Sequence, residues 1–387
     1  MRKIREDVFY VGAQHWDRRL FDELIPTPEG TSYNAYLIKG SEKTVLIDSV
    51  DPAKEQVLFD NLSGIDRIDY VVANHAEQDH SGTLLKVLEK YPDSKLVTNL
   101  KCRDFLMDHV MIPEDRFMVV GDRDTLSLGN KTLEFILAPW VHWPETMFTY
   151  LREDRTLFPC DFLGSHVATT ELFAGENMEI YYGAKRYYAE IMMPFKHIIP
   201  KHLQKISELE IDLICPSHGP IWDKPEFILS AYRDWTSPEV RNQVLIPYVS
   251  MHDSTRIMVE HLTEELVNRG VDVKVFNLTV TDLGELAMAM VDAATIVFGV
   301  PTVLTGAHPV AYYAVYLTNA LRPKARHVGL IGSYGWGCRT VDQVKESLSN
   351  LKAEFLDPVY IKGIPKEEDL RSISKLADAI ADKHKNM

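Results

Sequence analysis

From residue 244 onward, short apolar stretches alternate with longer amphipathic ones. Residues 244–249 predict a buried strand, and residues 254–270 predict a helix that ends at Gly270. The alternation predicts a parallel, doubly wound sheet with right-handed helical crossovers. The remaining strands are expected at 271–276, 295–300, 327–331 and 359–362, and the remaining helices at 282–293, 309–321, 341–355 and 367–385.

Three loops that follow strands of this sheet carry candidate ligand-binding residues. Ligands of doubly wound sheets bind at the carboxyl ends of the strands, and helix N-termini bind anions. Glycines let the backbone approach a flat ring on which an aromatic side chain packs. A plain helix cap at Ser254 and an ordinary turn of small residues at 332–337 are the alternative interpretations. The candidates are Ser250, Met251, His252, Asp253, Ser254 and Thr255, then Pro301, Thr302, Val303 and Leu304, and finally Ser333, Tyr334, Gly335, Trp336 and Gly337.

The first half of the chain places four potential metal ligands within six residues: His75, Glu77, Asp79 and His80. An apolar, β-branched stretch at 69–74 precedes them and a helical pattern follows, so they are expected on a loop between a strand and a helix. Side chains at i and i+2 of an extended loop point the same way, which lets two pairs of ligands reach two neighbouring ions. A solvated surface loop is the alternative.

Three further candidates, His142, Asp161 and His218, each follow an apolar stretch that predicts a strand. Taken singly, each is more often an ordinary loop residue. A dense cluster followed in order by a His, an Asp and a His-Gly-Pro turn favours one shared site on a rigid scaffold. This mixed set of imidazoles and carboxylates suits iron, although ligand type does not exclude zinc or manganese.

Length and composition limit the remaining possibilities. A chain of 387 residues is expected to form two domains, here residues 1–240 and 241–387. The formal charge of −14 argues against nonspecific nucleic-acid binding, which requires a basic surface. Four scattered cysteines without a Cys-x-x-Cys pair indicate free thiols and a reducing, cytoplasmic location. No signal sequence and no membrane span are expected, because no apolar run is long enough.

The motif His-x-Glu-x-Asp-His, followed by His, Asp and Ser-His-Gly-Pro, resembles the metallo-β-lactamase superfamily, whose hydrolases carry His at the position of Glu77 and usually hold zinc. The form of the motif with Glu at position 77 resembles that of one branch of the superfamily, the flavodiiron proteins. The run Gly-Ser-Tyr-Gly-Trp-Gly at 332–337 is similar to the FMN loop of that family. The resemblance covers nearly the whole chain and extends to Tyr10-Val-Gly12, Trp16-Asp17 and residues 21–38.

The resemblance implies an N-terminal αββα metallo-β-lactamase-like sandwich with a two-metal site and a C-terminal flavodoxin-like domain that binds FMN. Two features depart from the family pattern. Asp253 stands where many relatives have Gly, and a carboxylate beside a phosphate is unfavourable unless it points away. Thr305 replaces an amide side chain. In the implied ligand sets, one iron takes His75, Glu77 and His142, the other takes Asp79, His80 and His218, and Asp161 bridges both, with His80 absent from the ligands of some members.

The implied activity is reduction of O2 to water, of NO to N2O, or of both at a non-haem diiron centre. Electrons would reach it through FMN from an external donor, rubredoxin or coenzyme F420. The family also implies a head-to-tail homodimer, or a dimer of dimers, that brings the FMN of one chain beside the iron pair of the other. Two alternatives stay open: a two-metal zinc hydrolase with an appended flavodoxin-like module, and an electron carrier with a vestigial metal site.

Overall fold

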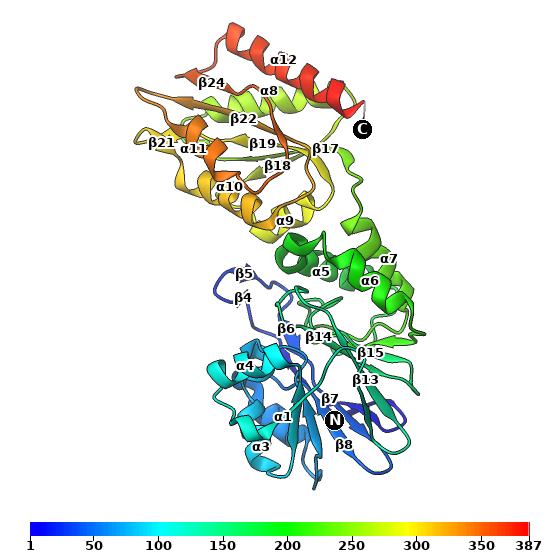
Figure 1. Cartoon of the computed structure of the whole chain (residues 1–387). Helices are drawn as coiled ribbons and strands as arrows, with labels where there is room; N and C mark the ends of the chain where they lie inside the picture. Colours follow the sequence, from blue (N-terminus) through cyan, green and yellow to red (C-terminus); the bar gives the residue numbers. More distant parts are fainter. Residues whose placement is uncertain (386) are drawn as a thin grey trace. The chain divides into compact units, whose positions relative to one another are not determined.

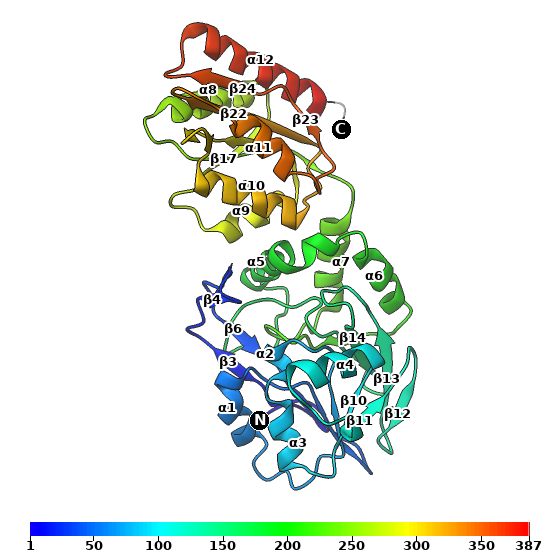
Figure 2. The same cartoon turned by 60° about the vertical axis from the view of Figure 1, so that its left-hand side comes forward.

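A computed structural model describes residues 1–385 and 387 of the chain (Figures 1 and 2). The chain divides into two compact units, one formed by Met1–Tyr188 with Phe195–Thr236 and the other by Ala189–Pro194 with Ser237–Met387. Each unit is built around its own sheets. Among the described residues, no helix is both long and apolar enough to cross a lipid bilayer.

Two sheets form the centre of the first unit. The larger has the strand order β1-β2-β7-β8-β9-β10-β11, and the smaller has the order β12-β13-β14-β15-β16. The larger sheet contains β1 (Arg2–Arg5), β2 (Val8–Tyr10), β7 (Tyr36–Lys39), β8 (Thr44–Ile47), β9 (Tyr70–Val72), β10 (Lys95–Thr98) and β11 (Phe117–Val119). The smaller contains β12 (Thr125–Ser127), β13 (Thr132–Leu137), β14 (Met147–Leu151), β15 (Thr156–Phe158) and β16 (Leu213–Ile214). Two further antiparallel pairs are formed by β3 (Ala13–His15) with β6 (Thr31–Tyr33) and by β4 (Leu20–Phe21) with β5 (Ile25–Pro26).

Alternation of side chains along the strands produces two apolar layers in this unit. Val72 faces the smaller sheet, where it joins a cluster with Phe135 and Met147, whereas Val71 faces the helices. Helices therefore cover the outer faces of two packed sheets, and the αββα sandwich expected from the resemblance is confirmed. The helices of this unit are α1 (Glu55–Asn61), α2 (Gln78–Ser81), α3 (Leu84–Lys90), α4 (Leu100–His109), α5 (Met178–Tyr187), α6 (Ile199–Ser207) and α7 (Pro225–Thr236), with 3-10 turns at Pro52–Lys54 and Glu114–Arg116. The segment Ala189–Pro194, which belongs to the second unit, contains most of a π-helical turn at Tyr188–Met192 and of a 3-10 turn at Met193–Phe195.

The second unit is a parallel sheet with strand order β18-β17-β19-β22-β23, and β24 also pairs with β22. This is the flavodoxin-like order, as expected. Helices α8 and α12 cover one face, and α9, α10 and α11 cover the other (Figure 1). The strands are β17 (Arg241–Tyr248), β18 (Asp272–Asn277), β19 (Ala293–Gly299), β22 (His327–Tyr334), β23 (Glu354–Phe355) and β24 (Val359–Lys362). The helices are α8 (Ser254–Asn268), α9 (Leu283–Met290), α10 (Pro309–Leu321), α11 (Thr340–Ser347) and α12 (Glu367–His384).

Local structure differs from the sequence-based expectation at three places. The helix expected at 341–355 ends at Ser347, because Glu354 and Phe355 pair with β22 as a short strand. The loop that carries His75, Glu77, Asp79 and His80 is extended only as far as Glu77. Asp79 and His80 lie in the helical turn α2. Residues 301–307 close into a hairpin of β20 (Thr302–Val303) and β21 (Gly306–Ala307).

The buried end of α12 makes the stability of the second unit sensitive to acid. His384 contacts the Thr295 hydroxyl and the Asn242 side chain, both at 2.8 Å, and lies beside His327. Burial and the nearby His327 lower the pKa of His384 from its ordinary value of 6.5 to about 4. Because the unfolded chain binds this proton more tightly, the stabilisation is present above pH 6.5 and is lost as pH falls toward about 4.

We expect His384→Gln to flatten part of this pH dependence, because glutamine keeps the polar contacts and cannot take up a proton. Urea unfolding midpoints measured by circular dichroism between pH 4.5 and 7.5 test this expectation. The parent midpoint should fall faster than that of the variant below pH 6.5. Parallel profiles for the two proteins would contradict it.

Candidate metal centre and cofactor pocket

The ends of four strands deliver the seven predicted metal ligands to one place in the first unit. His75 and its neighbours follow β9, His142 lies between β13 and β14, Asp161 follows β15, and His218 follows β16. All seven side chains belong to overlapping groups in which ligand atoms lie within 4.8 Å of one another. Residues far apart in the sequence therefore converge on a single buried centre.

One group of ligand atoms surrounds the Glu77 carboxylate. The Nε2 atom of His142 lies 3.0 Å from Glu77 Oε2 and 3.0 Å from Asp161 Oδ2. The Nε2 atom of His75 lies 3.4 Å from each of the same two oxygens. Two imidazoles and two carboxylates thus face a common point.

A second group uses the other oxygen of Asp161. His80 Nε2 lies 3.1 Å from Asp161 Oδ1 and 3.0 Å from Asp79 Oδ2, and His218 Nε2 lies 3.2 Å from Asp79 Oδ2. The two imidazole Nε2 atoms are 3.1 Å apart. His80 therefore points toward the centre of this group together with His218, and Asp161 presents one oxygen to each group.

The donor set fits a pair of divalent cations. The Nε2 atom of His75, the Oδ1 atom of Asp161 and both oxygens of Asp79 are buried, yet they make no hydrogen bond with the described part of the chain. Buried polar atoms without partners are costly, and metal ions would satisfy them. His218 donates its Nδ1–H to the Ser32 carbonyl at 2.6 Å. The lone pair of its Nε2 atom is therefore free to face the site.

The electrostatics of the site also call for added positive charge. Burial lowers the pKa of His80, but the Asp79 and Asp161 carboxylates raise it to about 10. Burial likewise opposes charge on His142, while hydrogen bonds with Asp161 and Glu77 raise its pKa to about 9. The carboxylates thus retain protons on His80 and His142, and metal cations would take the place of those protons.

Hydrogen bonds outside the ligand groups hold the ligand-bearing loops. The Glu145 carboxylate accepts the Ala76 N–H at 3.0 Å, and the Ser81 hydroxyl donates to the Ala76 carbonyl at 2.7 Å. Asn34 donates its side-chain amide to the carbonyls of Pro216 and Gly219, on either side of His218. These bonds position the backbone of both loops before any ion binds.

Two residues beside the centre, Thr31 and Ser32, carried no recognisable sequence signal. Thr31 and Ser32 lie on β6, far from His218 in the sequence, yet the Thr31 hydroxyl is 2.9 Å from His166 Nδ1 and Ser32 accepts from His218. His166 is buried, and its ring lies 4.7 Å from that of His218 and 4.8 Å from that of Tyr187. A small β-hydroxyl residue is too common for its type alone to reveal such a role.

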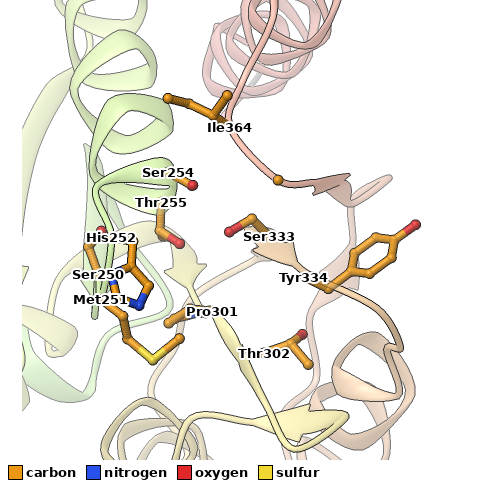
Figure 3. A pocket seen from close by; sticks show the side chains of 12 residues that line it. Ser250, Met251, His252, Ser254, Thr255, Pro301, Thr302, Ser333, Tyr334 and Ile364 are labelled. Carbon is orange, nitrogen blue, oxygen red and sulfur yellow. The ribbon is translucent and has the colours of Figure 1, made fainter.

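A cavity of about 270 Å³ opens at the carboxyl ends of the strands of the second unit (Figure 3). All three loops expected from the sequence contribute to its lining. The N-terminus of α8 borders it, so backbone N–H groups and the hydroxyls of Ser254 and Thr255 are available for an anion. The predicted residues that line it are Ser250, Met251, His252, Ser254, Thr255, Pro301, Thr302, Ser333, Tyr334 and Gly335.

Other residues lie differently from the expectation. Among the described residues, the lining does not include Asp253, Val303, Leu304, Trp336 or Gly337, and a role for them in ligand binding stays a prediction. Asp253 has φ +63° and pairs with Arg256 at 3.0 Å, so its carboxylate is occupied outside the cavity. The lining also includes Gly363 and Ile364 of the loop between β24 and α12, which carry no polar group that a motif search could have recognised.

Fold and sites together define a protein with a two-metal centre on a metallo-β-lactamase-like domain and a pocket at the strand ends of a flavodoxin-like domain. The family model described as ODP family beta lactamase matches residues 31–219. The nitric oxide reductase of Moorella thermoacetica is 36% identical over 393 residues, which are 98% of this chain and 97% of the relative.

Solved structures show the same similarity over both domains. Rubredoxin oxygen:oxidoreductase of Desulfovibrio gigas superposes with a TM-score of 0.95 at 29% identity and covers 99% of this chain and 98% of its own. The flavodiiron protein of Giardia intestinalis gives a TM-score of 0.91 at 28% identity, with the same coverage. The chain belongs to the flavodiiron protein family.

The turn that carries His218 depends on a glycine. Gly219 has φ +77°, and a Cβ atom there would lie 2.1 Å from Ser165 Oγ and 2.8 Å from the Ser165 carbonyl oxygen. We expect Gly219→Ala to displace His218 and to destabilise the protein by about 1–3 kcal/mol. Gly64→Ala is the matched control, because Gly64 has φ +78° and nothing within 4 Å of an added Cβ.

Thermal unfolding and iron content after anaerobic reconstitution measure the two effects. Gly219→Ala should lower both, whereas Gly64→Ala should lower stability only by the backbone strain that the two variants share. Equal iron content and equal stability in both variants would show that the close approach to Ser165 does not matter.

Proposed function

We propose that this chain is a flavodiiron oxidoreductase that reduces O2 to water, NO to N2O, or both. The observation that carries the proposal is Asp161, whose two oxygens face two separate groups of imidazole and carboxylate ligands in a buried centre. A pocket suited to a flavin mononucleotide in the same chain supports it, because both reactions need a supply of electrons. A hydrolase would have no use for that pocket.

The ligands proposed for one iron are His75, Glu77 and His142, and those for the other are Asp79, His80 and His218, with Asp161 shared. When bound, the iron pair would supply two electrons and an electrophilic site for a small gaseous substrate. The chain supplies three carboxylates that offset the charge of two divalent cations, which limits the cost of burying them. Its hydrogen-bonded loops keep the imidazole Nε2 atoms directed at the centre.

FMN is the proposed second cofactor, in the pocket of the second unit. Ser254 and Thr255, at the N-terminus of α8, would hold its phosphate, and the loops that carry Thr302 and Tyr334 would hold its ring. Complete reduction of O2 needs four electrons, of which a reduced flavin supplies two and a ferrous pair the other two. The external donor is proposed to be rubredoxin or reduced coenzyme F420, and the free cysteines agree with a reducing, cytoplasmic setting.

Reaction with each gas tests this function. We expect purified protein to contain two iron atoms and one FMN per chain, and the anaerobically reduced protein to be reoxidised rapidly by O2, NO or both. Asp161→Asn should retain FMN and lose iron, and reoxidation should slow by more than about 100-fold, with peroxide rather than water formed from O2. Asp93→Asn, an exposed carboxylate, is the control.

Metal analysis separates this function from the zinc hydrolase. Zinc without flavin, together with ester hydrolysis, would contradict the proposal, as would reduced, iron-loaded protein that neither gas reoxidises. Stopped-flow absorbance of the flavin and an amperometric assay of each gas give the required measurements.

We further propose a head-to-tail homodimer in which the flavin of one subunit serves the metal centre of the other. The support is the family resemblance together with the exposed Leu304 and Trp336, which are 83% and 77% accessible in one chain. Both follow strands that border the cavity. Large apolar side chains this exposed are suited to a covering partner surface.

Subunit complementation tests this arrangement. Asp161→Asn removes a metal ligand, and Thr255→Glu places a carboxylate where the phosphate would bind, so each homodimer should be inactive. Co-expression of the two variants should restore up to about one quarter of parental activity, because half of the dimers are mixed and each holds one intact pair of sites. No restoration in verified mixed dimers would contradict transfer between subunits.

A further inference from the structure

Tyr360 lies on β24 at the edge of the second sheet, yet it bonds to a strand that is not its neighbour. In the ladder, Tyr360 pairs with Gly332 of β22, and β22 lies between β24 and β19. The Tyr360 hydroxyl nevertheless donates to the Val300 carbonyl, just past β19, at 2.8 Å, and lies 2.7 Å from the Thr302 hydroxyl. Its ring therefore crosses over β22.

The crossing is possible because residue 332 is a glycine. A Cβ atom at Gly332 would lie 2.0 Å from the Val300 carbonyl oxygen and 2.7 Å from Cε2 of Tyr360. Any larger residue would push the Tyr360 ring away from β22 and break both contacts. Gly332 opens the glycine-rich loop that the sequence associates with a flavin, so it has a second role beneath that loop.

The hydroxyl groups form a chain with one direction. Tyr360 has a single hydroxyl proton and donates it to Val300, so it accepts from Thr302, which in turn accepts from the Thr340 hydroxyl at 2.8 Å. The Cys338 sulfur, at 3.8 Å, is a second and more distant acceptor for the Thr302 hydroxyl. Burial raises the pKa of Tyr360 to about 12, although hydrogen bonds with Thr302 and Thr340 oppose this, so the phenol stays protonated at neutral pH.

Tyr360 contacts both loops that border the cavity. Thr302 lines the cavity on one side, and Tyr334, whose ring stacks on that of Tyr360 at 6.2 Å and 7°, lines it on another (Figure 3). Tyr360 is not among the described residues of the lining. It thus connects the two loops from beneath, without reaching the space that a ligand would fill.

We propose that Tyr360 is a positioning residue for the flavin, which fixes the separation of the two loops and the orientation of the Thr302 hydroxyl. This inference rests on the proposed binding of FMN in the cavity. The aromatic ring of Tyr360 supports Tyr334, and its hydroxyl holds Thr302. Removal of the hydroxyl alone leaves the stacked rings in place and frees the Thr302 proton to turn toward other acceptors.

The first test is Tyr360→Phe in the full-length protein. We expect FMN affinity, measured by fluorescence quenching on titrating FMN into flavin-free protein, to fall by about threefold to tenfold, as for one lost buried hydrogen bond. The visible circular dichroism of the bound flavin and its midpoint potential should also change. Tyr312→Phe is the matched control, because it removes one hydroxyl from the same unit, bonded to Ser347 at 2.7 Å on α10 and outside the lining.

A double-mutant cycle tests the link to Thr302 directly. Thr302→Val should weaken FMN binding. Because Thr302→Val already removes the contact between the two hydroxyls, Tyr360→Phe should lower FMN affinity less in the Thr302→Val background than in the parent protein. Thr302→Ser, which keeps the hydroxyl, should restore most of the affinity. Additive effects in the double variant would overturn the inference.

Two further outcomes are distinguishable from these. If Tyr360→Phe lowers the melting temperature but leaves the flavin dichroism, potential and affinity equal to those of Tyr312→Phe, the role of Tyr360 is only structural and the inference is wrong. If the unmodified protein binds no FMN, the proposed function itself fails, and this inference fails with it.

Discussion

Buried carboxylates need compensating positive charge, and this requirement is most severe at Asp161. Its side chain is almost completely buried, and its two oxygens face two groups of imidazoles. An isolated carboxylate in this position would be very costly, whereas one shared between two cations is stabilised from both sides. The surrounding strands and loops can be understood as the scaffold that holds opposite charges at hydrogen-bonding distance without solvent.

Both sites use the same structural solution. Strands are rigid and buried, and the loops at their ends are free to carry polar groups, so function concentrates where strands stop. In the first unit four strand ends bring ligands together, and in the second unit three loops enclose a cavity. Second-layer contacts then refine the geometry: Asn34 beneath the His218 turn, and Tyr360 beneath the loops of the cavity.

Much of this arrangement was predictable because candidate ligands can be recognised from their residue types. Seven candidate ligands in a fixed order, and an alternation of strands and helices, require no tertiary information to be recognised. The exceptions have physical causes. Glu354 and Phe355 pair with β22 as a strand and do not continue α11. The helical periodicity of the sequence does not show this preference. Asp253 pairs with Arg256, one turn along α8, which a list of loop residues does not show.

The amino-acid sequence by itself determined the two-domain architecture, the parallel order of the second sheet and the set of candidate metal ligands, because periodicity and residue chemistry are local properties. Only the tertiary structure decided which oxygen of Asp161 faces which imidazoles, that His80 turns toward the centre, and that Thr31, Ser32, Gly363 and Tyr360 lie at or beneath the sites. These facts depend on contacts between segments distant in the chain, and such contacts exist only after the sheets have packed.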